Sequence, residues 1–154
     1  MSNWQTAYRR KILSQPDDII DIMPKTGRMV LGHAAGEPMA LVEAVISQRQ
    51  RFSGMEIVHM VPLGPCHYCE PGMDQHFRHN ALFVGGPSRL AVQDERADYT
   101  PVFFSQIPRL FQQKLLPVDV ALICVSPPDQ DGWMSYGVSV DYTEAATARK
   151  ASRR

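Results

Sequence analysis

The chain has 154 residues, of which 44% are hydrophobic, and its 16 basic and 16 acidic residues leave no formal net charge. A chain of this length can bury one hydrophobic core, so we expect a single domain over residues 1–154. The balanced charge argues against a nucleic-acid partner, because a protein that binds a polyanion needs an excess of basic residues on one surface.

The first residues do not have the pattern of an export signal or a membrane anchor. The basic cluster Arg9-Arg10-Lys11 is not followed by an apolar stretch, and nowhere do about 18 apolar residues run together. The three cysteines are an odd number in a chain large enough to fold without disulfides, which favours a reducing compartment. We therefore expect a cytoplasmic protein with no membrane contact.

The N-terminal third of the chain predicts two short helices, a strand and a third helix. Apolar residues recur at helical spacing over residues 3–13, and Ser14 followed by Pro16 has the pattern of a second helix start. Residues 29–32 form a short apolar run that glycine ends, which predicts a strand, and residues 38–46 carry a broad apolar face that predicts a helix.

The same alternation of strands and helices continues along the rest of the chain. We expect short helices over 88–93 and 105–111, and buried strands over the following ranges: 55–61, 81–84, 101–104 and 118–125. Strands that are continuously apolar are typical of a parallel sheet covered on both faces. We therefore expect an α/β fold with a mostly parallel sheet flanked by helices. Residues 147–154 turn basic and never return to an apolar strand, which predicts an unfinished, truncated sheet.

Several segments carry a resemblance to a known family. In residues 118–143 a buried strand leads into the double-proline turn Ser126-Pro127-Pro128-Asp129 and returns through glycines to a helix. Four further segments, in order, are residues 32–38, 59–64, 83–89 and 97–108. Together they resemble the acetyl-CoA hydrolase/transferase family, and within it the butyrate and 4-hydroxybutyrate coenzyme A transferases. The resemblance covers almost the whole chain, from Trp4 to about Ala146.

This resemblance implies an enzyme that transfers coenzyme A from an acyl-CoA to a short-chain carboxylic acid, at an active site between two α/β domains. Coenzyme A would be a substrate, and no cofactor is implied. The nucleophile of the family is a glutamate in the C-terminal domain, where a carboxylate attacks the thioester and becomes a glutamyl thioester. This chain would be the N-terminal domain, with that catalytic domain absent. No glutamate of the chain has a matching context: Glu37, Glu43, Glu56, Glu70, Glu95 or Glu144.

His33 is the candidate catalytic residue. It lies between a predicted strand and a predicted helix, where open α/β sheets present groups to ligands. The resemblance places it at the position of an active-site histidine, which could donate a hydrogen bond to the acyl carbonyl oxygen or to the substrate carboxylate.

Met60, Gly32 and Gly36 are candidate substrate-binding residues. Met60 matches a position in the acyl pocket of the family, although its thioether could equally pack in the core. Gly32 and Gly36 would let the backbone approach a ligand, or would serve only the geometry of a tight turn. We expect Glu37 to be a helix N-terminal charge rather than a catalytic group, and Ser126-Pro127-Pro128-Asp129 to have a structural role.

An alternative hypothesis is a zinc site. Its ligands would come from the segment Cys66-His67-Tyr68-Cys69 together with His76 and His79. Only six residues separate Cys69 from His76, where about a dozen are usual in a zinc finger, so we expect no metal site and a variable surface loop. Three hypotheses for function therefore stand. They are a transferase domain that is inactive without its C-terminal half, a non-catalytic remnant, and a zinc-binding module. We also expect a homo-oligomer, because the domain would expose an apolar face.

Overall fold

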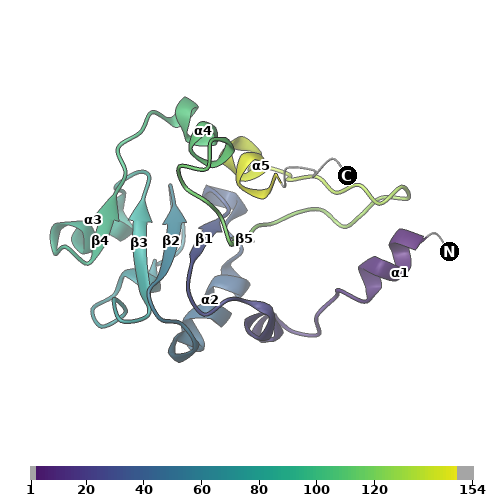
Figure 1. The fold of residues 1–154 in the computed structure, drawn as a ribbon, viewed down its shortest axis with the longest axis horizontal. Helices are drawn as coiled ribbons and strands as arrows, with labels where there is room; N and C mark the ends of the chain where they lie inside the picture. The colour runs from purple at the N-terminus through teal and green to yellow at the C-terminus, as the bar shows by residue number, and fades with distance from the viewer. Residues whose placement is uncertain (1–2, 149–154) are drawn as a thin grey trace.

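In the computed structural model, which describes residues 3–148, five parallel strands form one sheet in the order β4-β3-β2-β1-β5 (Figure 1). The strands are β1 (Arg28–Leu31), β2 (Met55–His59), β3 (Phe77–Ala81), β4 (Ala97–Tyr99) and β5 (Val120–Leu122). This arrangement confirms the expected α/β class. The basic ending at 149–154, on which the prediction of an unfinished sheet depends, lies outside the described residues.

Helices connect the strands and flank the sheet. The α-helices are α1 (Asn3–Arg9), α2 (Met39–Ser47), α3 (Gly86–Gln93), α4 (Ile107–Gln112) and α5 (Asp141–Thr147). Single turns of 3-10 helix are η2 (Ala34–Gly36), η3 (Arg49–Arg51), η4 (His67–Cys69) and η5 (Phe104–Gln106), and η1 (Pro16–Ile22) is longer. The second predicted helix is thus a 3-10 helix, and the others lie within a few residues of their expected positions.

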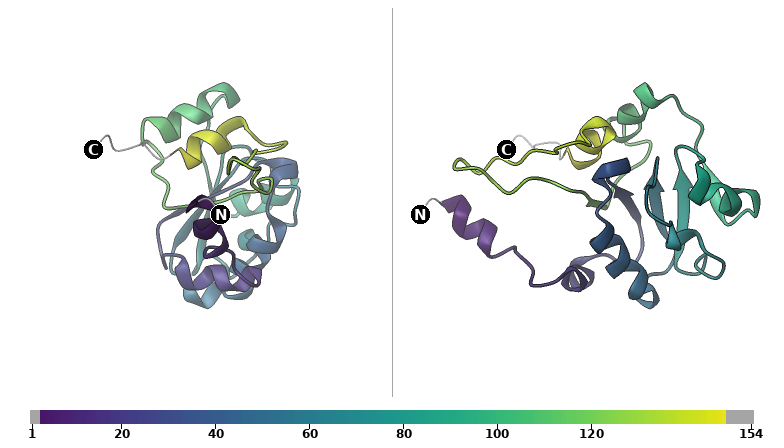
Figure 2. Two further views of the ribbon diagram at one scale, coloured as in Figure 1. Left: turned by 90° about the vertical axis from the view of Figure 1, so that its right-hand side faces the viewer. Right: turned by 180° about the vertical axis from the view of Figure 1, so that it is seen from behind.

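The two faces of the sheet support two separate clusters of buried apolar residues. Successive side chains of a strand point to opposite faces, so Met29 and Val30 of β1 belong to different clusters. Met29 packs in the larger cluster with Val45 of α2, whereas Val30 packs with Phe111 of α4 and Tyr142 of α5. Figure 2 shows that α4 and α5 lie together near the carboxyl ends of the strands and away from α2.

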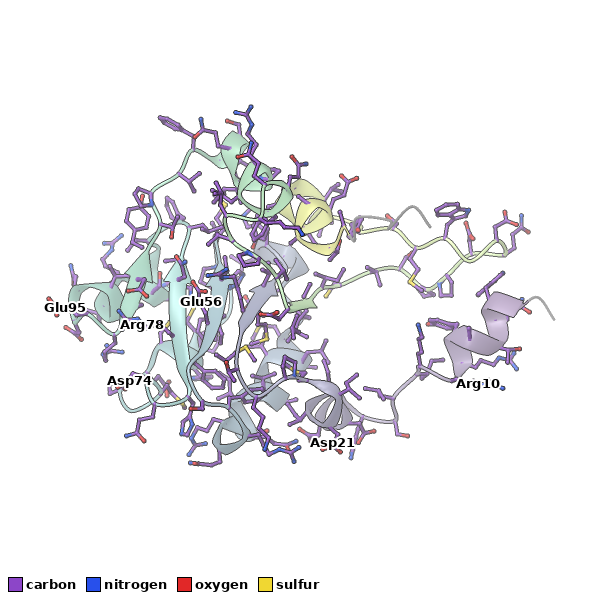
Figure 3. All side chains as sticks on the ribbon, viewed as in Figure 1. Arg10, Asp21, Glu56, Asp74, Arg78 and Glu95 are labelled. Atoms are coloured by element: carbon purple, nitrogen blue, oxygen red, sulfur yellow. The ribbon has the colours of Figure 1, made fainter. Side chains whose placement is uncertain are left out.

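The prediction of a strand at 81–84 is wrong, because the strand occupies Phe77–Ala81 and contains three polar residues. Arg78 pairs with Asp98 of β4 through two hydrogen bonds of 2.9 and 2.5 Å. Asn80 donates to the Glu56 carboxylate of β2 at 2.7 Å. Figure 3 shows Glu56 and Arg78 on neighbouring strands of the sheet. Cross-strand pairing therefore replaces the apolar pattern that strand prediction relies on.

The prediction of a strand at 101–104 is also wrong. The observed strand is β4 at Ala97–Tyr99, and its pairing with β3 ends where the backbone N–H of Thr100 donates to the oxygen of Ala81, before the 3-10 turn Phe104–Gln106. Pro101 has no backbone N–H to donate to a neighbouring strand, which disfavours this segment as part of a sheet. The strand at Ala97–Tyr99 was not predicted because the exposed Asp98 interrupts the run of apolar residues on which the prediction depended.

Helix α1 and residues 123–140 project together from the sheet (Figures 1 and 2). The turn at the tip of the 123–140 segment is held by Asp129, whose Oδ1 accepts hydrogen bonds from the backbone N–H groups of Asp131 and Trp133, both at 2.9 Å. This contact confirms the structural role expected for the double-proline turn. Trp4 of α1 packs against Gly132, where a side chain would meet the indole ring.

No helix within residues 3–148 is long and apolar enough to cross a membrane. The projecting segment nevertheless exposes large apolar side chains, and Trp133 and Val138 remain 75% and 79% exposed. An exposed apolar surface of this kind is the feature from which the sequence predicted association with another polypeptide.

Candidate active site

The sheet has one position at which its strand order changes direction. From β1 the chain moves to β2, β3 and β4 on one side, and β5 then pairs with the opposite edge of β1. In open α/β sheets, ligands bind beside the carboxyl ends of the strands at this point of reversal. His33 lies two residues after the end of β1, so the structure brings the predicted catalytic residue to this point.

His33 is held by Asp141, a residue that is 108 positions away in the sequence. The Nδ1 atom of His33 lies 2.8 Å from Oδ2 of Asp141, and both side chains are largely buried. Asp141 is the first residue of α5, and its other oxygen accepts a hydrogen bond of 2.6 Å from the backbone N–H of Tyr142. The carboxylate is therefore fixed from both sides and orients the imidazole.

The contact with Asp141 determines what the other ring nitrogen of His33 can do. An ionised carboxylate only accepts hydrogen bonds, so Nδ1 of His33 carries the proton. Within the described part of the chain, the hydrogen bonds of this ring involve Nδ1 alone. The Nε2 atom is then an acceptor in the neutral ring and a donor in the imidazolium form.

Aromatic rings pack around His33. The Phe104 ring lies edge-on at a centroid distance of 5.6 Å, and the Tyr142 ring lies at 5.7 Å. The Tyr142 hydroxyl donates to the backbone oxygen of Leu31 at 2.8 Å, and burial raises the pKa of this phenol, so it stays neutral. Met60 packs against the cluster that contains Tyr142, so the second predicted site residue lies on the same wall.

Gly32 and Gly36 face protein atoms. A side chain on Gly32 would overlap the backbone oxygen of Gly36, and one on Gly36 would overlap the hydroxyl of Ser139. That hydroxyl donates to the backbone oxygen of His33 at 2.5 Å. These contacts support the turn-geometry alternative for both glycines, and their contact with a ligand stays a prediction.

An apolar groove of about 440 Å³ lies at the carboxyl end of β4. Its lining residues are Tyr99, Pro101, Val102, Phe103 and Gln106. The Phe103 side chain is 76% exposed, and the next residue is the Phe104 that contacts His33.

Glu37 holds the loop that follows β2 through hydrogen bonds, and we call this pair of contacts the Glu37 clamp. It is not the helix N-terminal charge that the sequence predicted. Its side chain is buried, and Oε2 accepts hydrogen bonds of 3.0 Å from the backbone N–H groups of both Leu63 and Gly64. The first turn of α2, the helix that follows Glu37, contains no acidic residue. Because Glu37 already accepts two hydrogen bonds, it is a poor candidate for a nucleophile.

We expect Glu37→Ala to lower the free energy of unfolding by about 2 to 3 kcal/mol, since the backbone N–H groups of Leu63 and Gly64 lose a buried, charged acceptor. Urea denaturation followed by circular dichroism measures this change. Glu43→Ala, on the exposed side of α2, is the matched control and should change stability by less than about 0.5 kcal/mol. Equal stability of Glu37→Ala and the parent chain would contradict the clamp.

The segment that was expected to be a variable surface loop, residues 66–69, is instead largely buried. Cys66, Tyr68 and Cys69 are 3%, 1% and 7% exposed, so the surface-loop prediction is wrong. His76 and His79 each use Nδ1 to contact a backbone oxygen. Within residues 3–148, no three histidine, cysteine or acidic residues gather as a group that could hold a metal ion, so the zinc alternative gains no geometric support.

Asp141 is the residue of the candidate site that sequence reasoning missed. It lies inside the resembling segment 118–143, and an acidic residue at a predicted helix start was a visible feature. The sequence did not indicate that this helix start faces His33, because that contact depends on β5 lying next to β1.

Comparisons with known proteins identify the family of the chain. A family model described as the acetyl-CoA hydrolase/transferase N-terminal domain matches residues 1–152. The 4-hydroxybutyrate coenzyme A transferase of Clostridium kluyveri is 50% identical over 143 residues, which are 93% of this chain and 33% of that protein. The succinyl-CoA:acetate/propanoyl-CoA:succinate CoA transferase of Fasciola hepatica is 36% identical over 138 residues, or 88% of this chain and 28% of that protein.

Among solved structures, the 4-hydroxybutyrate CoA-transferase of Porphyromonas gingivalis matches with a TM-score of 0.72 at 30% identity. The match covers 94% of this chain and 32% of that one. This chain thus spans about a third of the length of the relatives it matches.

Proposed function

The chain belongs to the acetyl-CoA hydrolase/transferase family as an N-terminal domain, and from this premise we propose that it forms one wall of the active site of a coenzyme A transferase. The observation that carries the proposal is His33, oriented by Asp141 at the point where the strand order reverses. In this proposal Nε2 of His33 hydrogen-bonds the oxygen of the acyl group or of the substrate carboxylate.

The transfer needs a carboxylate nucleophile, which we propose is a glutamate of the C-terminal domain. That carboxylate attacks the thioester carbonyl, and the mixed anhydride that forms is attacked by the released coenzyme A thiolate. The products are a glutamyl thioester and the first free acid, and a second acid then reverses the sequence. Stabilising the oxyanion of each addition is the role we assign to His33.

Water must be excluded from these intermediates, because hydrolysis would destroy the thioester instead of transferring it. The aromatic side chains beside His33 support such exclusion, since Phe104 and Tyr142 cover two sides of the imidazole. The opposite side of the site would be closed by the C-terminal domain.

We propose 4-hydroxybutyrate and butyrate as the substrate acids, with acetate as the exchange partner. The most direct support is the 50% identity to the transferase of Clostridium kluyveri that is named for 4-hydroxybutyrate. Met60 and the apolar groove beside Phe103 would contact a short acyl chain, for which a flexible thioether and aromatic edges are suitable surfaces.

The remaining parts of the proposal concern partners and location. Coenzyme A would be a substrate rather than a bound cofactor, and a homo-oligomer would cover apolar side chains such as Trp133. Sedimentation as a monomer at high concentration would count against the oligomer. A cytoplasmic location stays a prediction from the cysteine content.

We expect the 154-residue chain alone to show no transfer of coenzyme A from butyryl-CoA to acetate, because the proposed nucleophile is a glutamate of the C-terminal domain. Glu37 and Glu56 are occupied by hydrogen bonds within the fold. Adding a separately produced polypeptide that corresponds to the remainder of the Clostridium kluyveri relative should restore turnover. A coupled assay for acetyl-CoA measures both reactions.

Turnover by the chain alone would refute the proposal that the nucleophile belongs to the C-terminal domain. No turnover with the added polypeptide, although sedimentation shows that the two bind, would favour the non-catalytic remnant. The C-terminal polypeptide assayed by itself is the necessary control, since only activity that depends on both parts assigns a role to this chain.

A further inference from the structure

The loop between β2 and β3 brings two cysteines together. The backbone N–H of Cys69 donates to the oxygen of Cys66 at 2.7 Å, which closes a turn over His67 and Tyr68. A four-residue turn holds its end Cα atoms within about 7 Å, and disulfides usually join Cα atoms about 4.4 to 6.8 Å apart. Both cysteines are free thiols in this structure. The backbone is therefore already shaped for a disulfide between them.

Hydrogen bonds connect this cysteine pair to the backbone beside His33. The Cys66 thiol lies 3.1 Å from the Tyr68 hydroxyl, which lies 2.9 Å from Nδ1 of His59. The Nε2 atom of His59 lies 3.0 Å from the backbone oxygen of Gly32, the residue that precedes His33. All three side chains are at least 97% buried, so water does not compete for these contacts.

The chemistry of the groups fixes the direction of every hydrogen bond in this chain. A backbone oxygen only accepts, so Nε2 of His59 carries the proton, and burial lowers the pKa of His59 to about 3, which keeps the ring neutral. Nδ1 must then accept from the Tyr68 hydroxyl. The Tyr68 oxygen in turn accepts from the thiol of Cys66, which is the first donor of the chain.

The two thiols also differ in acidity. The hydrogen bond with Cys69 lowers the pKa of Cys66 although burial opposes this effect. The hydrogen bond to Cys66, together with burial, raises the pKa of Cys69. An acidic first thiol beside a less acidic second one is the arrangement found in reactive Cys-X-X-Cys pairs.

We propose that Cys66 and Cys69 are a redox-active dithiol that closes to a disulfide, and that closure changes the hydrogen-bond chain through Tyr68 and His59 to Gly32. A disulfide sulfur carries no proton, so the Tyr68 oxygen loses its donor when the bond forms. The inference does not depend on the transferase proposal, because none of the measurements below involves turnover.

The oxidant in this proposal is a small-molecule disulfide such as oxidised glutathione. The thiolate of Cys66 attacks one sulfur of the oxidant and releases the first glutathione thiolate. The thiolate of Cys69 then attacks the Cys66 sulfur of the mixed disulfide and releases the second. Two electrons pass from the protein to the oxidant, and the two protons lost by the cysteines end on the two glutathione molecules.

The test uses the full chain carrying Cys124→Ser, which removes the exposed third thiol. The reduced protein is equilibrated in buffers of reduced and oxidised glutathione and is analysed by intact mass and peptide mapping. We expect a mass lower by two hydrogen atoms and a cross-link between Cys66 and Cys69. Failure of this cross-link to form in the folded chain, under buffers that oxidise the same chain in denaturant, would overturn the proposal.

A second measurement tests the connection to His59. Nitrogen-15 spectra of the histidine side chains should show Nε2 of His59 protonated in the reduced protein, with its shift changing when the disulfide forms. In Tyr68→Phe, which lacks the bridging hydroxyl, the cross-link should still form while the His59 change on oxidation is lost. If Tyr68→Phe does not fold, the comparison of reduced and oxidised parent chains decides the question, and an unchanged His59 would refute the connection.

The matched variant Cys69→Ser, also in the Cys124→Ser chain, tests the order of the two steps. Without the second thiol, glutathione should remain attached to Cys66. In the parent chain, oxidation should be slower than modification of the exposed Cys124, because buried thiols react only after local opening of the loop. Glutathione that attaches to Cys124 alone would contradict the reactivity proposed for Cys66.

Discussion

Replacing His33 with alanine is expected to lower kcat/KM for butyryl-CoA by about 100-fold to 1,000-fold, in the chain assembled with the C-terminal polypeptide. The loss of one preorganised hydrogen-bond donor at a developing oxyanion has an effect of this size, equivalent to about 3 to 4 kcal/mol. His33 is 17% exposed at its side chain and is fixed by Asp141, so its replacement removes a positioned group. Steady-state rates at varied butyryl-CoA measure the change.

Asp141→Asn separates positioning from hydrogen bonding by His33 itself. The amide keeps the shape of the side chain but no longer fixes the proton on Nδ1, so we expect a smaller loss, of about tenfold, mainly in kcat. The loss should also depend on pH, because Nε2 donates only from the imidazolium form, which a carboxylate beside Nδ1 stabilises and an amide does not. His67→Asn, on an exposed part of the β2–β3 loop, is the control and should keep full activity. An active His33→Ala enzyme would remove the basis of the proposed site.

Acidification to pH 4 is expected to destabilise the domain strongly, because two of its histidines are buried as neutral rings. Burial lowers the pKa of His59 from 6.5 to about 3 and that of His79 from 6.5 to about 4. The unfolded chain therefore binds more protons below pH 6.5 than the folded chain does. The stability is fully present above pH 6.5 and is lost as the pH falls toward the folded-state pKa values.

The expected loss at pH 4 is about 3 kcal/mol for each of these two histidines. A typical domain has a total stability of about 5 to 15 kcal/mol, so a combined loss of about 6 kcal/mol is enough to bring the domain close to its unfolding midpoint. Urea denaturation at a series of pH values from 7 to 4 measures the slope.

Two variants identify the histidines responsible for the acid transition. His79→Leu should flatten the dependence of stability on pH, because it removes one of the two titrating groups. The exposed His67→Asn should leave the dependence unchanged. A stability that stays constant from pH 7 to pH 5 would contradict the assignment of His59 and His79 as buried neutral rings.

The strands that the sequence placed close to their observed positions are β1, β2 and β5. Each contains a run of adjacent apolar residues, which is the feature that the prediction used. β3 was misplaced because Arg78 and Asn80 are paired with residues of neighbouring strands. Such pairing is a property of the folded sheet, and no pattern along a single strand reveals it.

The site divides in the same way. His33 could be proposed from the sequence because its position between a strand and a helix is a local feature, whereas Asp141 was missed because its contact joins distant parts of the chain. The cysteine loop was wrongly placed on the surface for a related reason. Residues 66–69 include polar side chains, but Tyr68 can be buried because its hydroxyl forms hydrogen bonds with Cys66 and His59.

The contact between Gly36 and Ser139 has a consequence for how the site can vary. Because Gly36 has no side chain, the segment before α5 can approach closely enough for Ser139 to bond the backbone of His33 and for Asp141 to meet its ring. A single added methyl group at this glycine would push that segment outward and separate the acid from the imidazole. The distance between His33 and Asp141 therefore depends on Gly36, which is not part of their hydrogen bond. Substitutions of Gly36 would disturb the orientation of the imidazole without changing either hydrogen-bond partner.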